Sequence, residues 1–377
     1  MSAAPLAGLK VVEFTHMVMG PAAGAVLAAL GAEVTRVEPE GGDHTRNLIG
    51  SGAGYFPMYN RHKDSVFLNL KSAEGLAEAK RLVCAADILI ENFRPGALDR
   101  LGLDYETLAA ANPGLIYCTL KGFLPGPYEN RTALDEVAQM MGGLAYMTGP
   151  PGRPLRAGTS VIDATGGMFG VIGILAALEE RHRTGRGQKI QAALFETTVW
   201  LVGQHMAQKA VTGQAAQPMP ARISAWAIYD VFETRDEPVF VGVVTDALWE
   251  KFCALFGLDE LWADESLRKN NERVQARNRI LPTIRAMFGE MTRAEIMQRL
   301  EGSGLPFAPI SRPEDLFEDP HLLASGALHR TILPDGNETF LPGLPLTLDG
   351  KRPGGEFVFD RLGERGMAEV DKAQGGA

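Results

Sequence analysis

A single carboxylate stands in an uncharged, glycine-rich stretch of this sequence. Asp163 is the only ionisable residue between Ala157 and Leu178. Because burying an unpaired charge is costly, this carboxylate needs a structural or a chemical reason. It is the N-cap of a helix that runs on through Leu178, a nucleophile at the positive end of that helix, or both, since the two interpretations are compatible. In the second interpretation the neighbouring glycines leave room for a bulky ligand.

A histidine and two cationic segments are the other groups suited to ligand binding. His16 follows the first apolar run, at the position where open α/β sheets bind ligands, although an isolated histidine is often structural. The segments 60–71 and 91–102 place cations beside apolar residues in predicted loops. That combination suits a ligand with phosphates and an adenine face, and the alternative is a pair of solvated loops.

Alternating apolar runs and helical stretches must position these groups. We predict strands at 9–14, 33–37, 87–91, 115–120 and 189–195, and helices at 21–30, 72–85 and 105–111. A longer helix begins near Asp163 and ends where a cationic cluster precedes Gly185. This rhythm is typical of an α/β fold with an open, mostly parallel, Rossmann-like sheet that carries helices on its faces.

The second half of the chain predicts a smaller α+β domain. A composition rich in Gly, Gln and Pro at 212–222 indicates a linker. Beyond it, strands are predicted at 227–232, 239–244 and 306–310, with helices at 246–256, 271–291 and 293–300, and short extended segments at 327–333 and 338–341. We therefore divide the chain into a large Rossmann-like domain (1–205), a linker (206–225), a small domain (226–320) and a segment returning to the large domain (321–377).

Composition and missing motifs exclude several classes of protein. The 377 residues include 46 acidic and 37 basic ones, a net charge of -9, which argues against nucleic acid or an anionic membrane as the main partner. Cys84, Cys118 and Cys253 lie far apart, so we expect no metal site or disulfide, and a reducing cytoplasmic location fits. No apolar run has the length of a membrane span, and the N-terminal residues lack the basic region and long apolar run of a signal peptide, so we expect a soluble protein. The loop after the first strand has glycine only at Gly20 and Gly24 and lacks G-x-G-x-x-G, so we expect no nicotinamide or flavin.

In their order, the motifs resemble those of the family III CoA transferases of the CaiB/BaiF type. This group includes formyl-CoA transferase, carnitine CoA transferase and the 2-methylacyl-CoA racemases. The matching pieces are Phe14-Thr15-His16 with Gly20-Pro21, Asn60-x-x-Lys63-x-Ser65, Leu68-Asn69-Leu70-Lys71, Glu91-Asn92-Phe93-Arg94-Pro95-Gly96, Asn112-Pro113, Lys121-Gly122-Phe123, Val137-Ala138-Gln139, Asp163-Ala164-Thr165-Gly166-Gly167 and Arg183-Thr184-Gly185-Arg186-Gly187-Gln188.

The resemblance implies covalent catalysis by Asp163. Its carboxylate would attack an acyl-CoA thioester, pass through a mixed anhydride and an aspartyl-CoA thioester, and hand CoA to an acceptor acid. The helix N-terminus would keep this carboxylate ionised. Coenzyme A enters as the acyl-CoA substrate, and no metal is implied. The residues that would contact it are His16 and Met17 near the first turn, and Leu68, Asn69, Leu70, Lys71, Asn92, Phe93, Ala97, Arg100 and Leu101 at the adenine end.

Departures from the family pattern reduce the range of expected substrates and reactions. A glutamine, an arginine, a lysine and a tyrosine of formyl-CoA transferase are replaced here by Val18, Pro39, Thr132 and Leu134. These changes disfavour oxalate or formate. Leu134 also stands where the racemases carry a proton-transferring histidine, so a 2-methylacyl-CoA racemase or epimerase remains an alternative only if His182 or His205 has been recruited. A non-catalytic CoA-binding protein is the second alternative.

The resemblance also suggests the substrates and the assembly. Four arginines are candidates for holding a second carboxylate, which favours a dicarboxylate pair such as succinyl-CoA with a C4–C5 diacid; they are Arg46, Arg94, Arg131 and Arg156. Family members form interlocked homodimers, and the predicted linker and return segment are compatible with such an assembly.

Overall fold

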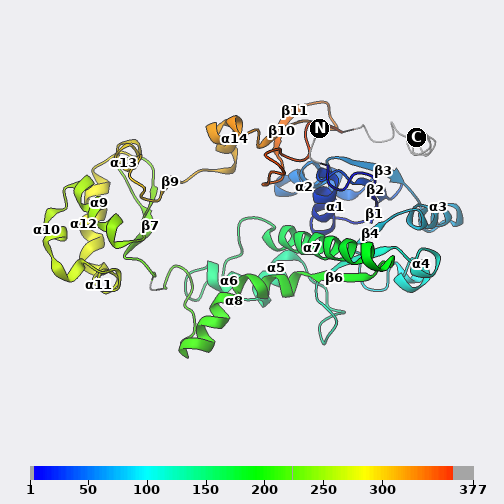
Figure 1. Ribbon diagram of the computed structural model, residues 1–377, viewed down its shortest axis with the longest axis horizontal. Coiled ribbons are helices and arrows are strands. Elements are labelled where there is room, and N and C mark those ends of the chain that lie inside the picture. The colour runs from blue at the N-terminus through cyan, green and yellow to red at the C-terminus, as the bar shows by residue number, and fades with distance from the viewer. Residues whose placement is uncertain (1–3, 223, 360–377) are drawn as a thin grey trace. The chain divides into compact units, whose positions relative to one another are not determined.

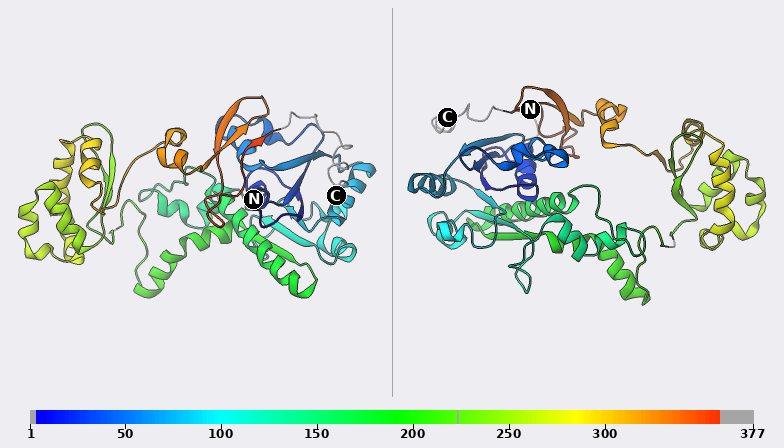
Figure 2. Two further views of the ribbon diagram at one scale, coloured as in Figure 1. Left: turned by 45° about the horizontal axis from the view of Figure 1, so that its top comes forward. Right: turned by 180° about the vertical axis from the view of Figure 1, so that it is seen from behind.

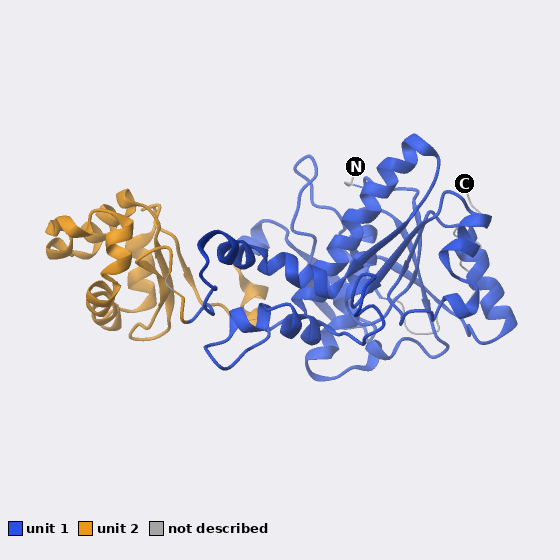
Figure 3. Cartoon of the chain, turned by 90° about the horizontal axis from the view of Figure 1, so that it is seen from below, with its two compact units in different colours: residues 1–220, 320–377 blue, residues 221–319 orange. Residues whose placement is uncertain are grey.

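The computed structural model describes residues 4–222 and 224–359 and divides the chain into two compact units (Figure 3). The large unit comprises Met1–Pro220 and Pro320–Ala377, and the small unit is Ala221–Asp319. The large unit is therefore assembled from two segments that are far apart in sequence.

A six-stranded sheet forms the centre of the large unit (Figure 1). All its strands are parallel to their neighbours, in the order β3-β2-β1-β4-β5-β6. This confirms the predicted parallel α/β sheet. The order reverses between β1 and β4, and open α/β sheets bind ligands outside the carboxyl ends of their strands at such a point. The strands are β1 (Lys10–Phe14), β2 (Glu33–Glu38), β3 (Lys63–Phe67), β4 (Ile88–Glu91), β5 (Ile116–Lys121) and β6 (Lys189–Ala193).

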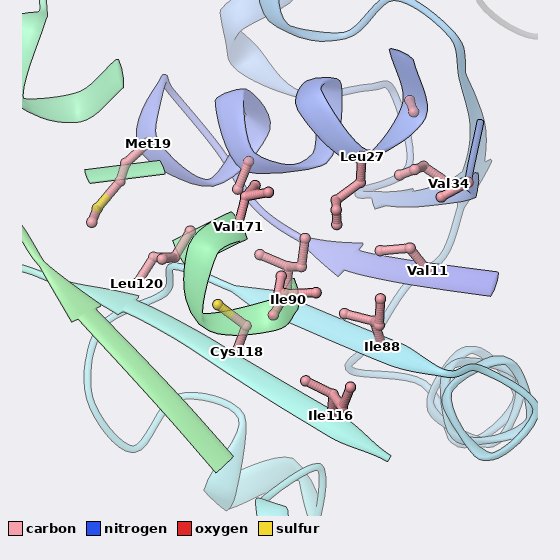
Figure 4. Packing of buried hydrophobic residues seen from close by; sticks show 14 of the residues in the cluster. Val11, Met19, Leu27, Val34, Ile88, Ile90, Ile116, Cys118, Leu120 and Val171 are labelled. Atoms are coloured by element: carbon pink, nitrogen blue, oxygen red, sulfur yellow. The ribbon is translucent and has the colours of Figure 1, made fainter. Parts of the chain in front are cut away.

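Helices cover both faces of the sheet because successive strand residues point to opposite sides. Val11, Ile88 and Ile90 belong to a core shared with α1 and α7, part of which Figure 4 shows. Val12 and Leu89 point the other way, into a core shared with α3 and α4. These four helices are α1 (Met19–Ala29), α3 (Ala73–Cys84), α4 (Tyr105–Ala111) and α7 (Val161–Thr184).

Helix α7 is the longest element of the large unit. By length and composition it could cross a membrane. Its inner face, however, is packed against α1, β5 and β6. Of the other helices in the large unit, α5 (Asp135–Met141) and α8 (Leu194–Thr212) contact α7. Shorter helices of the unit are α2 (Tyr55–Tyr59), α6 (Leu144–Thr148) and α14 (Pro320–Ala324).

The chain returns to the large unit as a second, three-stranded sheet. Strands β10 (Leu328–Ile332) and β11 (Glu338–Pro342) are antiparallel, and β12 (Phe357–Val358) runs parallel to β10. Figure 2 shows this sheet beside the N-terminal half of the unit. The buried guanidinium of Arg61 donates hydrogen bonds to the carbonyls of Leu341 (3.3 Å) and Pro342 (2.5 Å).

The small unit has its own sheet and core. An antiparallel sheet of β7 (Ile228–Phe232), β8 (Val239–Val243) and β9 (Phe307–Pro309) packs with helices around Trp249, Phe252 and Phe288. The helices are α9 (Asp246–Phe256), α10 (Asp259–Ala263), α11 (Asn270–Gln275), α12 (Arg277–Gly289) and α13 (Arg293–Leu300).

Four predicted elements need correction. The loop predicted at 60–71 contains β3, an edge strand whose polar residues concealed it. The strand predicted at 189–195 ends at Ala193, where α8 begins, and the helix predicted at 271–291 is broken at Ala276 into α11 and α12. Residues 206–212 of the predicted linker are helical, because α8 continues until Gly213 ends it in the left-handed conformation.

Candidate functional site

Asp163 lies in the first turn of α7, but it is not the N-cap. Ser160 occupies that position, and the amide hydrogens at the start of the helix are taken by another residue. Asp135 Oδ2 accepts hydrogen bonds from the backbone nitrogens of Ile162 (2.8 Å) and Asp163 (3.0 Å). Within the described part of the chain, the Asp163 carboxyl has neither a hydrogen bond nor an ion pair. The capping interpretation of Asp163 is therefore wrong.

The electrostatic setting of Asp163 also differs from expectation. Burial, and after it the negative charge of Asp135, raises the pKa of the Asp163 carboxyl to about 7. The prediction that the helix N-terminus keeps this group ionised is wrong, because the helix end is already neutralised by Asp135. A carboxyl with a pKa near neutrality and no partner is unusual outside functional sites.

Glycines bring α7 close to α1 and so place Asp163 at the edge where the parallel strands end. A Cβ on Gly166 would lie 2.7 Å from Met19 Cε, and one on Gly167 would lie 2.6 Å from the Met19 carbonyl oxygen. Since α1 starts just beyond the carboxyl end of β1, the first turn of α7 lies beside that end. The expectation that these two glycines leave room for a ligand is wrong, because α1 fills the space.

Hydrogen bonds join the loops that follow β1 and β4, where the strand order reverses. Asn92, which follows β4, accepts a hydrogen bond from the His16 backbone nitrogen and donates one to the His16 carbonyl, both 2.9 Å long. The His16 ring lies 5.6 Å from the Phe93 ring, measured between centroids. Burial lowers the pKa of His16, which favours the neutral form of the ring. Met17 adopts a left-handed backbone with φ of 60°, a strained conformation of the kind found at functional sites.

The remaining predicted CoA contacts divide into buried and accessible side chains. Leu68 is buried in the core beneath α3, and Leu70, Phe93 and Leu101 pack against the same core. This shared core brings the segments after β3 and β4 together. The accessible members are Asn69, Lys71 and Arg100, with Ala97 partly buried.

Two cations of the segment 60–71 are unavailable to a ligand. Lys63 Nζ lies 2.8 Å from Glu13 Oε1 in a fully buried ion pair that also reaches the Pro21 carbonyl at 2.9 Å. The Arg61 guanidinium is hydrogen-bonded to carbonyls of the return segment. Burial lowers the pKa of Lys63 to about 8 despite the charge of Glu13. Sequence reasoning missed this ion pair because its partners are 50 residues apart.

A cavity of about 130 Å³ opens next to the first turns of α7. Ala164 and Met168 of α7 line it, opposite the return segment, and Tyr59 contributes from α2. Burial, and after it the negative charge of Asp163, raises the pKa of Tyr59. Tyr59 therefore lies within electrostatic range of the Asp163 carboxyl. Nothing in the local sequence around Tyr59 indicated this.

The four arginines considered for a second carboxylate have different surroundings. Arg46 forms an ion pair with Glu38 at 2.6 Å, and Arg156 forms one with Glu136. Arg131 lies 5.0 Å above the Tyr128 ring. Arg94 is exposed. Arg94 and Arg131 are thus the two whose charge has no carboxylate partner within the described residues.

Comparison with known proteins identifies the family. The model of CoA-transferase family III matches residues 6–357. The chain belongs to CoA-transferase family III. Family III relatives include the acetyl-CoA:oxalate CoA-transferase of Acetobacter aceti, 34% identical over 97% of this chain and 94% of the relative. The succinate–glutarate CoA-transferase of Agrobacterium fabrum is 33% identical over 90% of this chain and 88% of its own.

A solved structure shares the family III fold. The crystal structure of a CaiB/BaiF family protein from Brucella suis superposes with a TM-score of 0.86 and 33% identity, covering 99% of this chain and 100% of the other. The protein is therefore a transferase enzyme of family III, whose members use CoA thioesters as substrates. In the described ranges, no group of three or more His, Cys, Asp or Glu side chains is arranged to hold a metal ion.

Proposed function

We propose that this enzyme transfers CoA between two carboxylic acids with Asp163 as its nucleophile. An Asp163 oxygen attacks the donor thioester carbonyl, the carbon–sulfur bond breaks, and CoA thiolate leaves behind a mixed anhydride. The thiolate then attacks the aspartyl carbonyl, which releases the donor acid and forms an aspartyl-CoA thioester. The acceptor carboxylate attacks this thioester, and thiolate attack on the acceptor side of the new anhydride yields the product and frees Asp163.

The partnerless carboxyl of Asp163 is the observation that carries this proposal. Its oxygens are not engaged by neighbouring donors, and its raised pKa makes it more nucleophilic once ionised than an ordinary carboxylate. The apolar surroundings from α1 and α7 would limit hydrolysis of the anhydride. This arrangement suits acyl transfer better than two-base proton transfer, because His182 lies at the opposite end of α7, about 28 Å along the helix axis.

We place CoA along the carboxyl ends of β1, β3 and β4. His16 and Met17 would line the path toward Asp163, and Asn92 would fix the turn that carries them. Asn69, Lys71, Ala97 and Arg100 would surround the adenine and phosphates, with Leu68, Leu70, Phe93 and Leu101 forming the support below. Of these side chains, Lys71 and Arg100 supply the accessible positive charge that phosphates require.

For the acids we propose dicarboxylates, with succinyl-CoA as a donor. The names of the Agrobacterium and Acetobacter relatives contain succinate, glutarate and oxalate, all of which are dicarboxylates. Of the four candidates, Arg94 and Arg131 are the ones available to hold a second carboxylate, because Arg46 and Arg156 are already paired with acids.

We further propose that the enzyme is a cytoplasmic, interlocked homodimer. Helix α7 exposes Met168, at the cavity, and then Ile172 and Leu175, which are spaced to form one apolar stripe, and Trp200 of α8 is 72% exposed. A continuous apolar surface of this kind is typical of a protein interface. Ile172→Asp should shift the dimer toward monomer in sedimentation experiments, whereas Ile49→Asp, at an exposed position far from the stripe in sequence, should not. A wild-type monomer at micromolar concentration would refute the proposal.

Acyl-CoA labelling tests the catalytic proposal. After incubation with succinyl-CoA, mass spectrometry should find the peptide containing Asp163 modified as an anhydride or CoA thioester. Asp163→Ala should abolish both labelling and exchange, while Asp259→Ala, at another first-turn aspartate, should leave both intact. Near-normal exchange by Asp163→Ala would refute the nucleophile. Indifference to succinyl-CoA but exchange with acetyl-CoA would remove only the dicarboxylate proposal, and CoA binding without any exchange would refute the proposed transfer between carboxylic acids.

A further inference from the structure

Asp135 is held at the start of α7 by a network of buried hydrogen bonds. Its side chain is almost fully buried in the first turn of α5. Oδ2 accepts the two α7 amide hydrogens, while Oδ1 accepts a hydrogen bond from the Gln139 side-chain amide. Gln139 Oε1 in turn accepts one from the Ala157 backbone nitrogen at 2.8 Å. The acid thus joins α5, the segment before α7 and the first turn of α7.

This network determines which hydrogen-bond donors remain available to Asp163. Free amide hydrogens in the first turn of a helix are the natural partners of a carboxylate placed there. Here the amides of Ile162 and Asp163 already bind Asp135. The Asp163 carboxyl consequently has no local donor, although it lies in the same turn. A carboxylate that is spared such bonds keeps its lone pairs available for attack on a carbonyl carbon.

The charge of Asp135 acts on Asp163 in the same direction. Two carboxylates that share one helix end disfavour ionisation of the second, because like charges repel at short range in a poorly solvated site. The titratable groups that face Asp163 are Asp135 from α5 and Tyr59 from α2, while α1 contributes the apolar Met19. Within the described residues, no cation offsets this repulsion.

We propose that Asp135 is a positioning residue of the transfer reaction: it occupies the amide hydrogens of α7 so that Asp163 stays a free nucleophile, and its negative charge acts on the neighbouring Asp163 carboxylate. The inference rests on the proposed role of Asp163. It assigns to Asp135 a function beyond helix capping, because a neutral cap would satisfy the amides equally well without acting on the neighbouring carboxyl.

The substitution Asp135→Asn separates the capping of the α7 amides from the effect of the Asp135 charge. The asparagine oxygen can still accept the α7 amide hydrogens. The Gln139 amide can turn to meet the new donor by giving up its bond with the Ala157 nitrogen, so the fold should persist with one buried hydrogen bond fewer. Loss of the charge should move the titration of Asp163 down by about one pH unit or more. The acid limb of kcat/KM against pH should move down by the same amount. Asp104→Asn is the matched control, because Asp104 caps α4 through the Thr107 amide on the other face of the sheet.

The titration of Asp163 is measured in ligand-free protein by carbon-13 NMR of labelled aspartate carboxyls, with Asp163→Asn assigning the signal. A downward shift in Asp135→Asn, absent in Asp104→Asn, supports the proposal, and an unchanged midpoint overturns it. If the midpoint shifts while the wild-type enzyme shows no CoA exchange, the proposed function fails and the electrostatic coupling stands. If the midpoint shifts but the pH profile of exchange does not, Asp135 has no positioning role in the reaction.

Discussion

Replacing Asp163 by asparagine should stabilise the protein at alkaline pH while removing its activity. Because the pKa of this carboxyl is raised to about 7 in the folded state, against 3.8 for the ordinary group, the folded protein binds the proton more tightly than the unfolded chain does. The stability that this contributes is complete below pH 3.8 and is lost as the pH rises through about 7. Above that pH the wild type carries an uncompensated charge that asparagine lacks.

The expected change in the free energy of unfolding follows from the size of the Asp163 pKa shift. Three pKa units correspond to about 4 kcal/mol at most, and less after solvent reaches the partly exposed carboxyl. Because the cost grows between the two pKa values, the advantage of Asp163→Asn should increase by up to about 2 kcal/mol from roughly pH 5.5 to about pH 8.5.

Urea unfolding of both proteins at several pH values and one protein concentration measures this difference. The matched control is Asp259→Asn, at an exposed aspartate in the first turn of α10, which should show no such gain. The reasoning is refuted if Asp163→Asn is no more stable than the wild type at the alkaline end, or if its advantage is independent of pH. Retained CoA exchange would separately refute the nucleophile.

Three further substitutions test the frame around the site. Gly167→Ala should cost about 1–3 kcal/mol in urea unfolding because its methyl group meets the α1 backbone, whereas Gly203→Ala on α8, with nothing within 4 Å, should gain about 0.5–1 kcal/mol. Lys63→Met should destabilise the fold by about 3–5 kcal/mol by leaving Glu13 buried and unpaired, and adding Glu13→Gln should restore much of the loss in the same assay. Asn92→Ala should weaken CoA binding about tenfold in calorimetry, since it frees the His16 turn; unchanged affinity would contradict its role.

The parallel sheet could be predicted because its inner strands have a recognisable sequence pattern. Strands β1, β4 and β5 are buried on both faces, so they appear as short continuous apolar runs, and helical stretches separate them. Strand β3 escaped prediction because it lies at the edge and begins with Lys63 and Asp64. A charged residue normally indicates a solvent-exposed position. Lys63 is instead buried against Glu13, a partner that comes close only in the folded sheet.

The site could be predicted only in part. Asp163 stood out because a lone acid in an apolar stretch is locally anomalous, and the loops after β1 and β4 follow from where parallel strands end. Asp135 could not be found in this way. It acts on a helix that begins 26 residues later, and in sequence it is an ordinary acid near the start of a short helix. A capping contact between two helices leaves no periodic signal.

The Arg61 contacts with Leu341 and Pro342 have a consequence for how the chain is made. They join residues 280 and 281 positions apart, and so the large unit needs the C-terminal segment to complete its contacts. On the ribosome the small unit, being one continuous segment, emerges whole while the large unit still lacks this segment. The nascent protein should therefore acquire a finished accessory unit before its catalytic unit is closed, and a chain released early, before residue 341, would leave the Arg61 cation without these two acceptors.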